Sequence, residues 1–280
     1  MPDNDRAHAE KPENHPEGSG MKDRDVKRYP GFGLIMALFF IYLYLPIVVL
    51  IVYSFNDSKL SAIWGGFSLR WYYSALQNRA LLDAVLTSFK VGIVSAMLAT
   101  IIALMAALVL IRGKQVPFRN LSTTVINLPI LLPEVVLAVA MLILFARIGL
   151  ESGIWKLIIA HTTFCTPFAF LPIRARLQGM SPELEEAGQD LYGTPWRNFW
   201  RVTLPGIAPG VFAGAMLAFL MSMDDFITSM LLTSGGATTL PVYIFSLIRV
   251  GTSPELNAIS ALVILASLSF AIVVILLRRR

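Results

Sequence analysis

Apolar residues occur along this chain in runs of about twenty, separated by short polar segments. A helix needs about 20 residues to cross the hydrocarbon core of a bilayer, so each run predicts one transmembrane helix. The pattern therefore predicts an all-α membrane protein with six transmembrane helices. They cover about residues 33–53, 84–111, 121–145, 154–173, 207–232 and 256–277.

The third run is the least regular, because Pro129 and Pro133 interrupt it four residues apart. A proline inside a helix frees a backbone carbonyl, which at membrane depth must face protein or a water-filled cavity. The two prolines indicate either a broken helix beside a cavity or an ordinary kink in a packed helix. The sequence leaves both open.

Composition agrees with a membrane protein, since 56% of the 280 residues are hydrophobic and 15% are charged. Soluble proteins have about 25% charged residues. The single cysteine, Cys165, cannot form a disulfide within the chain, and its apolar surroundings predict a small buried side chain. The net charge of +5 does not indicate a nucleic-acid partner, because membrane topology accounts for it.

Lysine and arginine mark one side of the membrane. They precede the first run, follow the second and the fourth, and end the chain. Because cytoplasmic loops carry the excess of these residues, both termini are predicted to be cytoplasmic. The residues are Lys22, Arg24, Lys27, Arg28, Arg112, Lys114, Arg119, Arg174, Arg176, Arg197, Arg201, Arg278, Arg279 and Arg280.

The chain divides into a polar segment, residues 1–29, and a membrane domain, residues 30–280. The first segment mixes charges, prolines and glycines without apolar periodicity, which predicts a flexible cytoplasmic tail. On the outer side, the longest loop is rich in aromatic residues such as Trp64, Trp71 and Tyr72. This composition is suited to a short helix at the level of the lipid headgroups.

The segment from about 178 to 205 carries helix signals of its own. Ser181-Pro182 and Thr194-Pro195 each place a capping residue before a proline, which predicts two helix starts. Gly193 separates the two helices, and Leu204-Pro205-Gly206 is predicted to end the second. The resulting cytoplasmic knob is either a docking surface for another protein or an amphipathic loop on lipid headgroups.

This segment resembles the EAA loop of ABC importer permeases. The similar stretches are Glu185-Glu186-Ala187-Gly188-Gln189-Asp190-Leu191, Thr194-Pro195 and Val202-Thr203-Leu204-Pro205. In that family the loop fits a groove on a cytoplasmic ATPase and transmits its closure to the channel. The resemblance therefore implies a type I ABC importer permease fold. It assigns ATPase coupling to Glu185, Glu186, Ala187, Gly188, Asp190, Gly193, Leu204 and Pro205.

Two positions depart from the family pattern. Gly188 stands where alanine is usual, and the motif glycine falls at Tyr192, with Gly193 one place later. Either departure could change the bend between the two short helices of the knob.

Further segments are similar to the polyamine branch of these permeases, the spermidine/putrescine importers. They are Tyr53-Ser54-Phe55-Asn56, His161-Thr162-Thr163-Phe164-Cys165, Ser222-Met223-Asp224-Asp225, Thr239-Leu240-Pro241, Arg249-Val250-Gly251 and Pro254-Glu255-Leu256-Asn257-Ala258. The resemblance implies a polyamine permease in a bacterial inner membrane, surrounded by lipid. The implied partners are a second, related permease, a cytoplasmic ABC ATPase dimer and a periplasmic polyamine-binding protein. ATP and magnesium would be bound by the ATPase, with no cofactor on this chain.

Two acids, Asp224 and Asp225, lie within the fifth apolar run. A carboxylate at membrane depth costs several kcal/mol unless it faces a polar cavity or a partner, so it is a candidate for function. Small residues recur every four positions before these acids, at Gly206, Gly210, Gly214, Ala218 and Ser222. Both aspartates lie within the arc of this stripe and are predicted to face the bundle or the partner permease.

Polyamines are multivalent cations, so carboxylates in a translocation path suit them. The candidate substrate-binding residues are Asp224, Asp225 and Glu134, the last directly after the Pro133 break. The alternative is that one aspartate is structural and caps a broken helix or pairs with an arginine. Glu255 is predicted to cap a helix, and His161 to form an interhelical hydrogen bond rather than a proton relay.

Several chemical motifs are missing from the sequence. It contains no G-x-x-x-x-G-K-[ST] phosphate loop, no metal-ligand cluster and no nucleophile–base motif. The chain is therefore predicted to be a transport subunit and not an enzyme. Three alternatives stay open: a permease for an amino acid or an iron complex, an ion-coupled secondary carrier, and a membrane subunit without transport.

Overall fold

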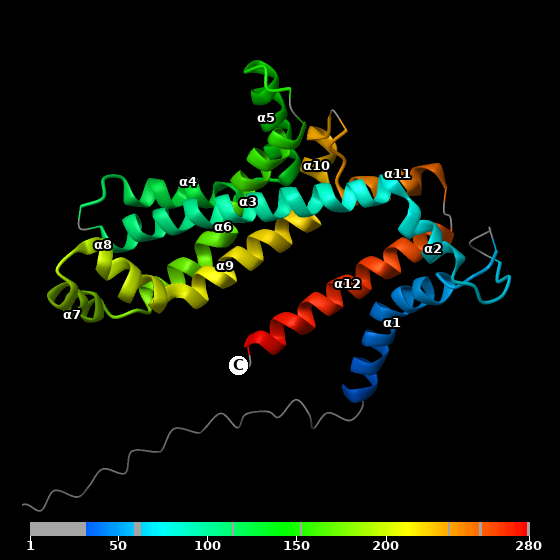
Figure 1. The fold of residues 1–280 in the computed structure, drawn as a ribbon, viewed down its shortest axis with the longest axis horizontal. Coiled ribbons are helices and arrows are strands. Elements are labelled where there is room, and N and C mark those ends of the chain that lie inside the picture. The colour runs from blue at the N-terminus through cyan, green and yellow to red at the C-terminus, as the bar shows by residue number, and fades with distance from the viewer. Residues whose placement is uncertain are drawn as a thin grey trace, which may run out of the picture. The chain divides into compact units, whose positions relative to one another are not determined.

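The computed structural model describes residues 32–58, 63–113, 115–151, 153–234, 236–251 and 254–278. Within these ranges the regular structure is helical, apart from one isolated antiparallel bridge between Asn56 and Phe67 (Figure 1). The predicted tail, residues 1–29, lies outside the described residues. The chain forms two compact units, Met1–Val49 and Leu50–Arg280.

The helices follow one another in chain order, and one short element among them is a π-helix, η2. They are α1 (Phe32–Tyr53), α2 (Arg70–Gln77), α3 (Arg79–Arg112), α4 (Arg119–Leu131), α5 (Glu134–Arg147), α6 (Gly153–Gln178), α7 (Pro182–Tyr192), α8 (Pro195–Asn198), η2 (Phe199–Thr203), α9 (Leu204–Asp224), α10 (Ile227–Leu232), α11 (Leu240–Val250) and α12 (Pro254–Arg278).

The described residues contain four helices long and apolar enough to cross a membrane, or five if the bent pair α4–α5 is one span. The chain is thus a multi-pass membrane protein. The four are α1, α3, α6 and the continuous segment Pro195–Asp224. The segment predicted as the sixth span is helical and belongs to α12, of which Pro254–Ser269 counts as a shorter apolar helix.

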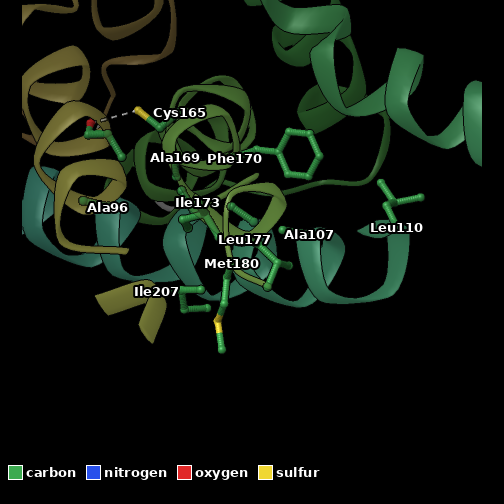
Figure 2. Close-up of a cluster of buried hydrophobic side chains, with 13 residues drawn as sticks. Ala96, Ala107, Leu110, Cys165, Ala169, Phe170, Ile173, Leu177, Met180 and Ile207 are labelled. Carbon is green, nitrogen blue, oxygen red and sulfur yellow. Dashed lines mark hydrogen bonds between the residues drawn. The ribbon is translucent and has the colours of Figure 1, made fainter. Parts of the chain in front are cut away.

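The core of the second unit is formed by α3, α6 and α9, which pack against one another. Alanines line the face of α3 in this core, among them Ala99, Ala103 and Ala107. The larger side chains come from α6, including Phe170 and Leu177 (Figure 2). Small residues on one helix let the backbones of membrane helices approach closely.

The small-residue stripe of α9 lies against α6, which confirms that it is a packing face. A Cβ atom at Gly214 would stand 2.6 Å from the carbonyl oxygen of Ala169. The same atom at Gly210 would stand 2.9 Å from the carbonyl oxygen of Pro172. Neither backbone can move away without separating the two helices, so glycine is required at both positions.

The predicted burial of Cys165 is confirmed. The residue lies on α6 and is 0% exposed. Its Sγ atom lies 3.2 Å from the carbonyl oxygen of Ala218 on α9, so this side chain also belongs to the interface between α6 and α9 (Figure 2).

Two of the predicted spans are broken. The third bends by 106° between α4 and α5, at the break before Glu134, so Pro133 interrupts the helix whereas Pro129 lies inside α4. The fifth was predicted as one helix over 207–232, and this was wrong. It ends at Asp224 and restarts at Ile227.

The loop between α1 and α3 contains the short helix α2, as predicted. Trp71 on α2 donates a hydrogen bond from Nε1 to the carbonyl oxygen of Asn56 at 2.9 Å. The amide of Asn56 donates to the carbonyl of Ile63 at 2.7 Å and accepts from the N–H of Gly65 at 2.7 Å. The motif that contains Asn56 therefore organises this loop.

Candidate translocation site and coupling loop

The two helix breaks meet, because α5 packs against α10 (Figure 1). Glu134 is the first residue of α5, Asp224 is the last residue of α9, and Asp225 follows directly. The carboxyl group of Glu134 interacts with that of Asp225, and it is close enough to Asp224 for the two negative charges to repel each other. The structure thus brings together the three acids that sequence analysis selected, and we call them the acidic junction.

Asp225 is built into the protein at this junction. Its side chain is 1% exposed, and its Oδ2 atom accepts a hydrogen bond from the N–H of Ser229 at 2.8 Å. Its Oδ1 atom accepts from the N–H of Thr228 at 3.3 Å. A carboxylate that accepts the first free N–H groups of a helix caps that helix, so Asp225 starts α10. These two bonds favour a new helix start after Asp225.

His161 on α6 joins four helices around Asp225. Its Nε2 atom lies 3.3 Å from Oδ2 of Asp225 and 3.2 Å from Oγ of Ser229. Its Nδ1 atom lies 2.6 Å from Oγ of Ser222, which in turn lies 3.2 Å from Oγ of Ser95 on α3. The prediction of an interhelical hydrogen-bonding histidine is confirmed.

Asp224 and Glu134 differ from Asp225 because both are exposed. Neither forms a salt bridge with a lysine or arginine in the part of the chain that the structure describes. The acidic junction therefore consists of one buried carboxylate that organises the helices and two accessible carboxylates. Accessible carboxylates at membrane depth can attract a cation.

The partnership between His161 and Asp225 was missed in the sequence. One signal was present: Asp225 is followed at the third and fourth positions by Thr228 and Ser229, whose N–H groups it caps. An aspartate before a short apolar turn is a usual helix start. The position of His161 carries no such local signal, because 63 residues of chain separate it from Asp225.

The coupling loop begins as predicted. Ser181 precedes α7, Gly193 ends it with a φ of +65°, and Thr194 caps α8 by accepting the N–H of Arg197. A φ in this left-handed region favours glycine, so the shifted motif glycine is at the position that ends the helix.

The predicted end of the loop at Leu204-Pro205 was wrong. The N–H of Leu204 bonds to the carbonyl of Phe199, five residues back, so η2 widens the helix there. Pro205 follows in the first turn of α9, where its missing N–H is tolerated. The loop and the fifth span form one continuous segment, Pro195–Asp224, that ends at the acidic junction.

Glu185 anchors the loop to the end of α3. Its Oε2 atom accepts a hydrogen bond from Nε of Arg112 at 2.8 Å, and its Oε1 atom accepts from Oγ1 of Thr203 at 3.2 Å. Arg112 also donates to the carbonyl of Met180 at 2.9 Å. The Arg112 and Glu185 side chains are 23% and 14% exposed. Glu185 is thus directed into the protein, and Arg112 is a partner of Glu185 that sequence analysis missed.

Other members of the loop face outward. Glu186, Ala187 and Asp190 are exposed. Large apolar side chains share this exposure, with Leu191 at 75% and Trp196 at 69%. An exposed apolar surface of this kind marks an interaction site.

Gly188 packs against the segment that follows it, so substitution by alanine is expected to destabilise the loop. A Cβ atom there would overlap Oδ1 of Asn198 and stand 2.8 Å from Cγ2 of Val202. Overpacking costs about 1–3 kcal/mol. Thermal unfolding of the purified protein should show a lower midpoint for Gly188→Ala. Adding Asn198→Ala should restore part of the loss, and a Gly188→Ala protein as stable as the parent would contradict this packing.

Broken membrane helices around an acidic junction, continuous with an exposed helical loop, define a membrane transport subunit. Residues 99–280 match the family described as "Binding-protein-dependent transport system inner membrane component". The chain belongs to this family. Its curated relatives are permease proteins, which agrees with the prediction of a transport subunit rather than an enzyme.

Two relatives from Escherichia coli strain K12 are similar over most of their length. The putrescine transport system permease protein PotI is 36% identical over 250 residues, which cover 87% of this chain and 89% of PotI. The spermidine/putrescine transport system permease protein PotC is 36% identical over 244 residues, which cover 86% of this chain and 90% of PotC. The resemblance to this branch of permeases is confirmed.

The fold is shared with a solved structure, that of a bacterial ABC transporter involved in the import of the acidic polysaccharide alginate. The TM-score is 0.68 at 15% sequence identity, with 86% of this chain and 93% of the other covered. The all-helical ABC importer permease fold predicted from the sequence is therefore confirmed.

Proposed function

We propose that this chain is the permease subunit of an ABC importer that moves putrescine or spermidine across a bacterial inner membrane. The observation that carries the proposal is the acidic junction, with Asp224 and Glu134 exposed where two broken spans meet. The names of the relatives PotI and PotC support the substrate class.

The substrate contacts follow from the chemistry of a polyamine. Its ammonium groups are cations that only donate hydrogen bonds, and exposed carboxylates accept them with charge assistance. Asp224 and Glu134 are assigned to this contact. Asp225 adds to the field of the site while it holds α10 and His161 in place. A weak, exposed site of this kind allows the cation to leave again.

The proposed topology has six crossings, with α12 as the last and both termini in the cytoplasm. The distribution of lysine and arginine supports it. The partners are a second permease, an ATP-hydrolysing dimer on the cytoplasmic side and a periplasmic polyamine-binding protein. The family description, which names dependence on a binding protein, supports the last of these.

Coupling runs through the continuous segment from the loop to the acidic junction. Closure of the ATPase dimer moves the exposed face of α7 and α8, and Pro195–Asp224 transfers this motion to Asp224. Because Glu185 fixes the same loop to α3, the core helices move with it. The site then opens alternately to the two sides of the membrane.

Uptake of radiolabelled putrescine and spermidine tests the proposal in cells that lack their own polyamine import. The cells would express this chain with its partner subunits. Uptake is expected only with an ATPase partner that hydrolyses ATP, and it should persist briefly when an ionophore collapses the membrane potential. Uptake that needs the potential but no ATPase would indicate a secondary carrier. Uptake of an amino acid or an iron complex instead would change the substrate.

A further inference from the structure

A polar cavity lies apart from the acidic junction, at the ends of α3, α4 and α6 nearest the coupling loop. Its volume is about 500 Å³. Polar side chains from two helices line it, including Arg119 and Asn120 on α4 and Arg174 and Gln178 on α6. Nothing in the proposed transport of a cation uses these residues.

The charges of this cavity select an anion. Arg119 donates one hydrogen bond to the carbonyl of Gly113 at 2.6 Å, and Arg174 lies over the ring of Phe170 at 6.0 Å. Within the described ranges neither guanidinium pairs with a carboxylate. Two cations that share one cavity repel each other unless an anion lies between them. The first turn of α4, which contains Arg119 and Asn120, adds positive potential.

The walls of the cavity are apolar where they continue along the helices. Leu110 and Phe170 line it, and both also belong to the buried cluster shown in Figure 2. Two leucines that each follow a lining residue in the sequence, Leu121 on α4 and Leu171 on α6, are 59% and 47% exposed. A free phosphate or nucleotide does not pack against apolar walls of this kind, whereas the acyl chains of a lipid do. Basic pockets between helices on the cytoplasmic side are suited to anionic lipid headgroups.

We infer that this cavity binds the phosphate headgroup of an anionic phospholipid from the cytoplasmic leaflet. The inference rests on the proposed topology, which places these helix ends on the cytoplasmic side. Guanidinium groups bind phosphate through paired hydrogen bonds, and Arg119 and Arg174 supply them. Arg119 also holds Gly113, the residue after Arg112, so a bound lipid supports the end of α3 that anchors the coupling loop.

Lipid retention by the assembled transporter tests the inference. The complex would be purified from membranes, reconstituted in bilayers of phosphatidylethanolamine with about one quarter phosphatidylglycerol, and analysed by native mass spectrometry. The double variant Arg119→Gln/Arg174→Gln is expected to bind phosphatidylglycerol about thirtyfold more weakly, because each arginine contributes about 1 kcal/mol. Arg119→Lys/Arg174→Lys keeps the charge and should lose less.

Arg176→Gln is the matched control, since Arg176 lies on the same helix but donates to the carbonyl of Gly206. Equal loss in this control, or unchanged lipid binding in the double glutamine variant, would overturn the inference. Competition by inorganic phosphate alone would make the cavity a soluble-anion site. Faster polyamine uptake by the double variant at unchanged lipid retention would place the cavity on the cation path. Because retention is measured without polyamine, its result does not depend on the transported substrate.

Discussion

Substituting Glu185 by alanine is expected to lower polyamine uptake at least about tenfold while the ATPase partner still hydrolyses ATP. The substitution leaves Arg112 mostly buried without its carboxylate and releases Thr203. Loss of one partner from a buried ion pair costs about 3–5 kcal/mol, and the partial exposure of this pair reduces the cost. The loop would then move without taking α3 with it.

Uptake and ATP hydrolysis measured on the same reconstituted complex separate coupling from assembly. Arg112→Ala should reproduce the loss, and the double variant should be little worse than either single one, because the two residues act as one pair. Glu183→Gln is the control, since Glu183 is exposed on the same helix and bonds only to nearby Ser181 among its described contacts. Additive losses in the double variant would contradict the proposed anchor.

The positions of the spans could be predicted because a helix that crosses lipid needs a run of about twenty apolar residues, and such runs are visible in the sequence. The same runs could not reveal where a span breaks. The break in the fifth depends on one side chain, Asp225, bonding to two N–H groups rather than on any change in hydropathy. In the third, Pro133 gave a local signal, although a proline alone could not distinguish the 106° bend from a kink.

At the end of the coupling loop, the sequence predicted a break where the helix in fact continues. Leu204-Pro205-Gly206 predicts a helix end, yet the wider turn of η2 accommodates the missing N–H of the proline. The consequence is that the loop becomes continuous with α9. Gly188 is another position that only the structure explains. The sequence shows that Gly188 departs from the alanine of the family pattern, but only the nearby Asn198 side chain shows why this position has no room for a Cβ atom.

The acidic junction could be recognised only in the fold, because 89 residues lie between Glu134 and Asp224 in the sequence. The cost of a carboxylate in lipid identified each acid separately. What the sequence could not give was their different roles. Asp225 is satisfied by His161 and the start of α10, which leaves Asp224 and Glu134 accessible.

Removing the accessible charges with Asp224→Asn/Glu134→Gln is expected to reduce the efficiency of polyamine uptake by at least about a hundredfold, because two charge-assisted hydrogen bonds are lost. Each charge-assisted hydrogen bond to an ammonium group contributes about 1.5–3 kcal/mol. Protein abundance in the membrane should stay close to that of the parent, because both side chains are exposed. Uptake measured over a range of polyamine concentrations, beside quantitative immunoblots, checks both expectations.

Asp225 should respond differently, and this difference distinguishes the two roles. Asp225→Ala removes the cap of α10 and the partner of His161, so protein abundance is expected to fall together with uptake. Asp225→Asn keeps the capping oxygen and should be milder in abundance. Glu151→Gln, an exposed acid outside the junction, is the control for a general loss of negative charge. If the Asp224 and Glu134 variants lost abundance instead, both carboxylates would be structural. If these variants transported normally, the cation would bind elsewhere.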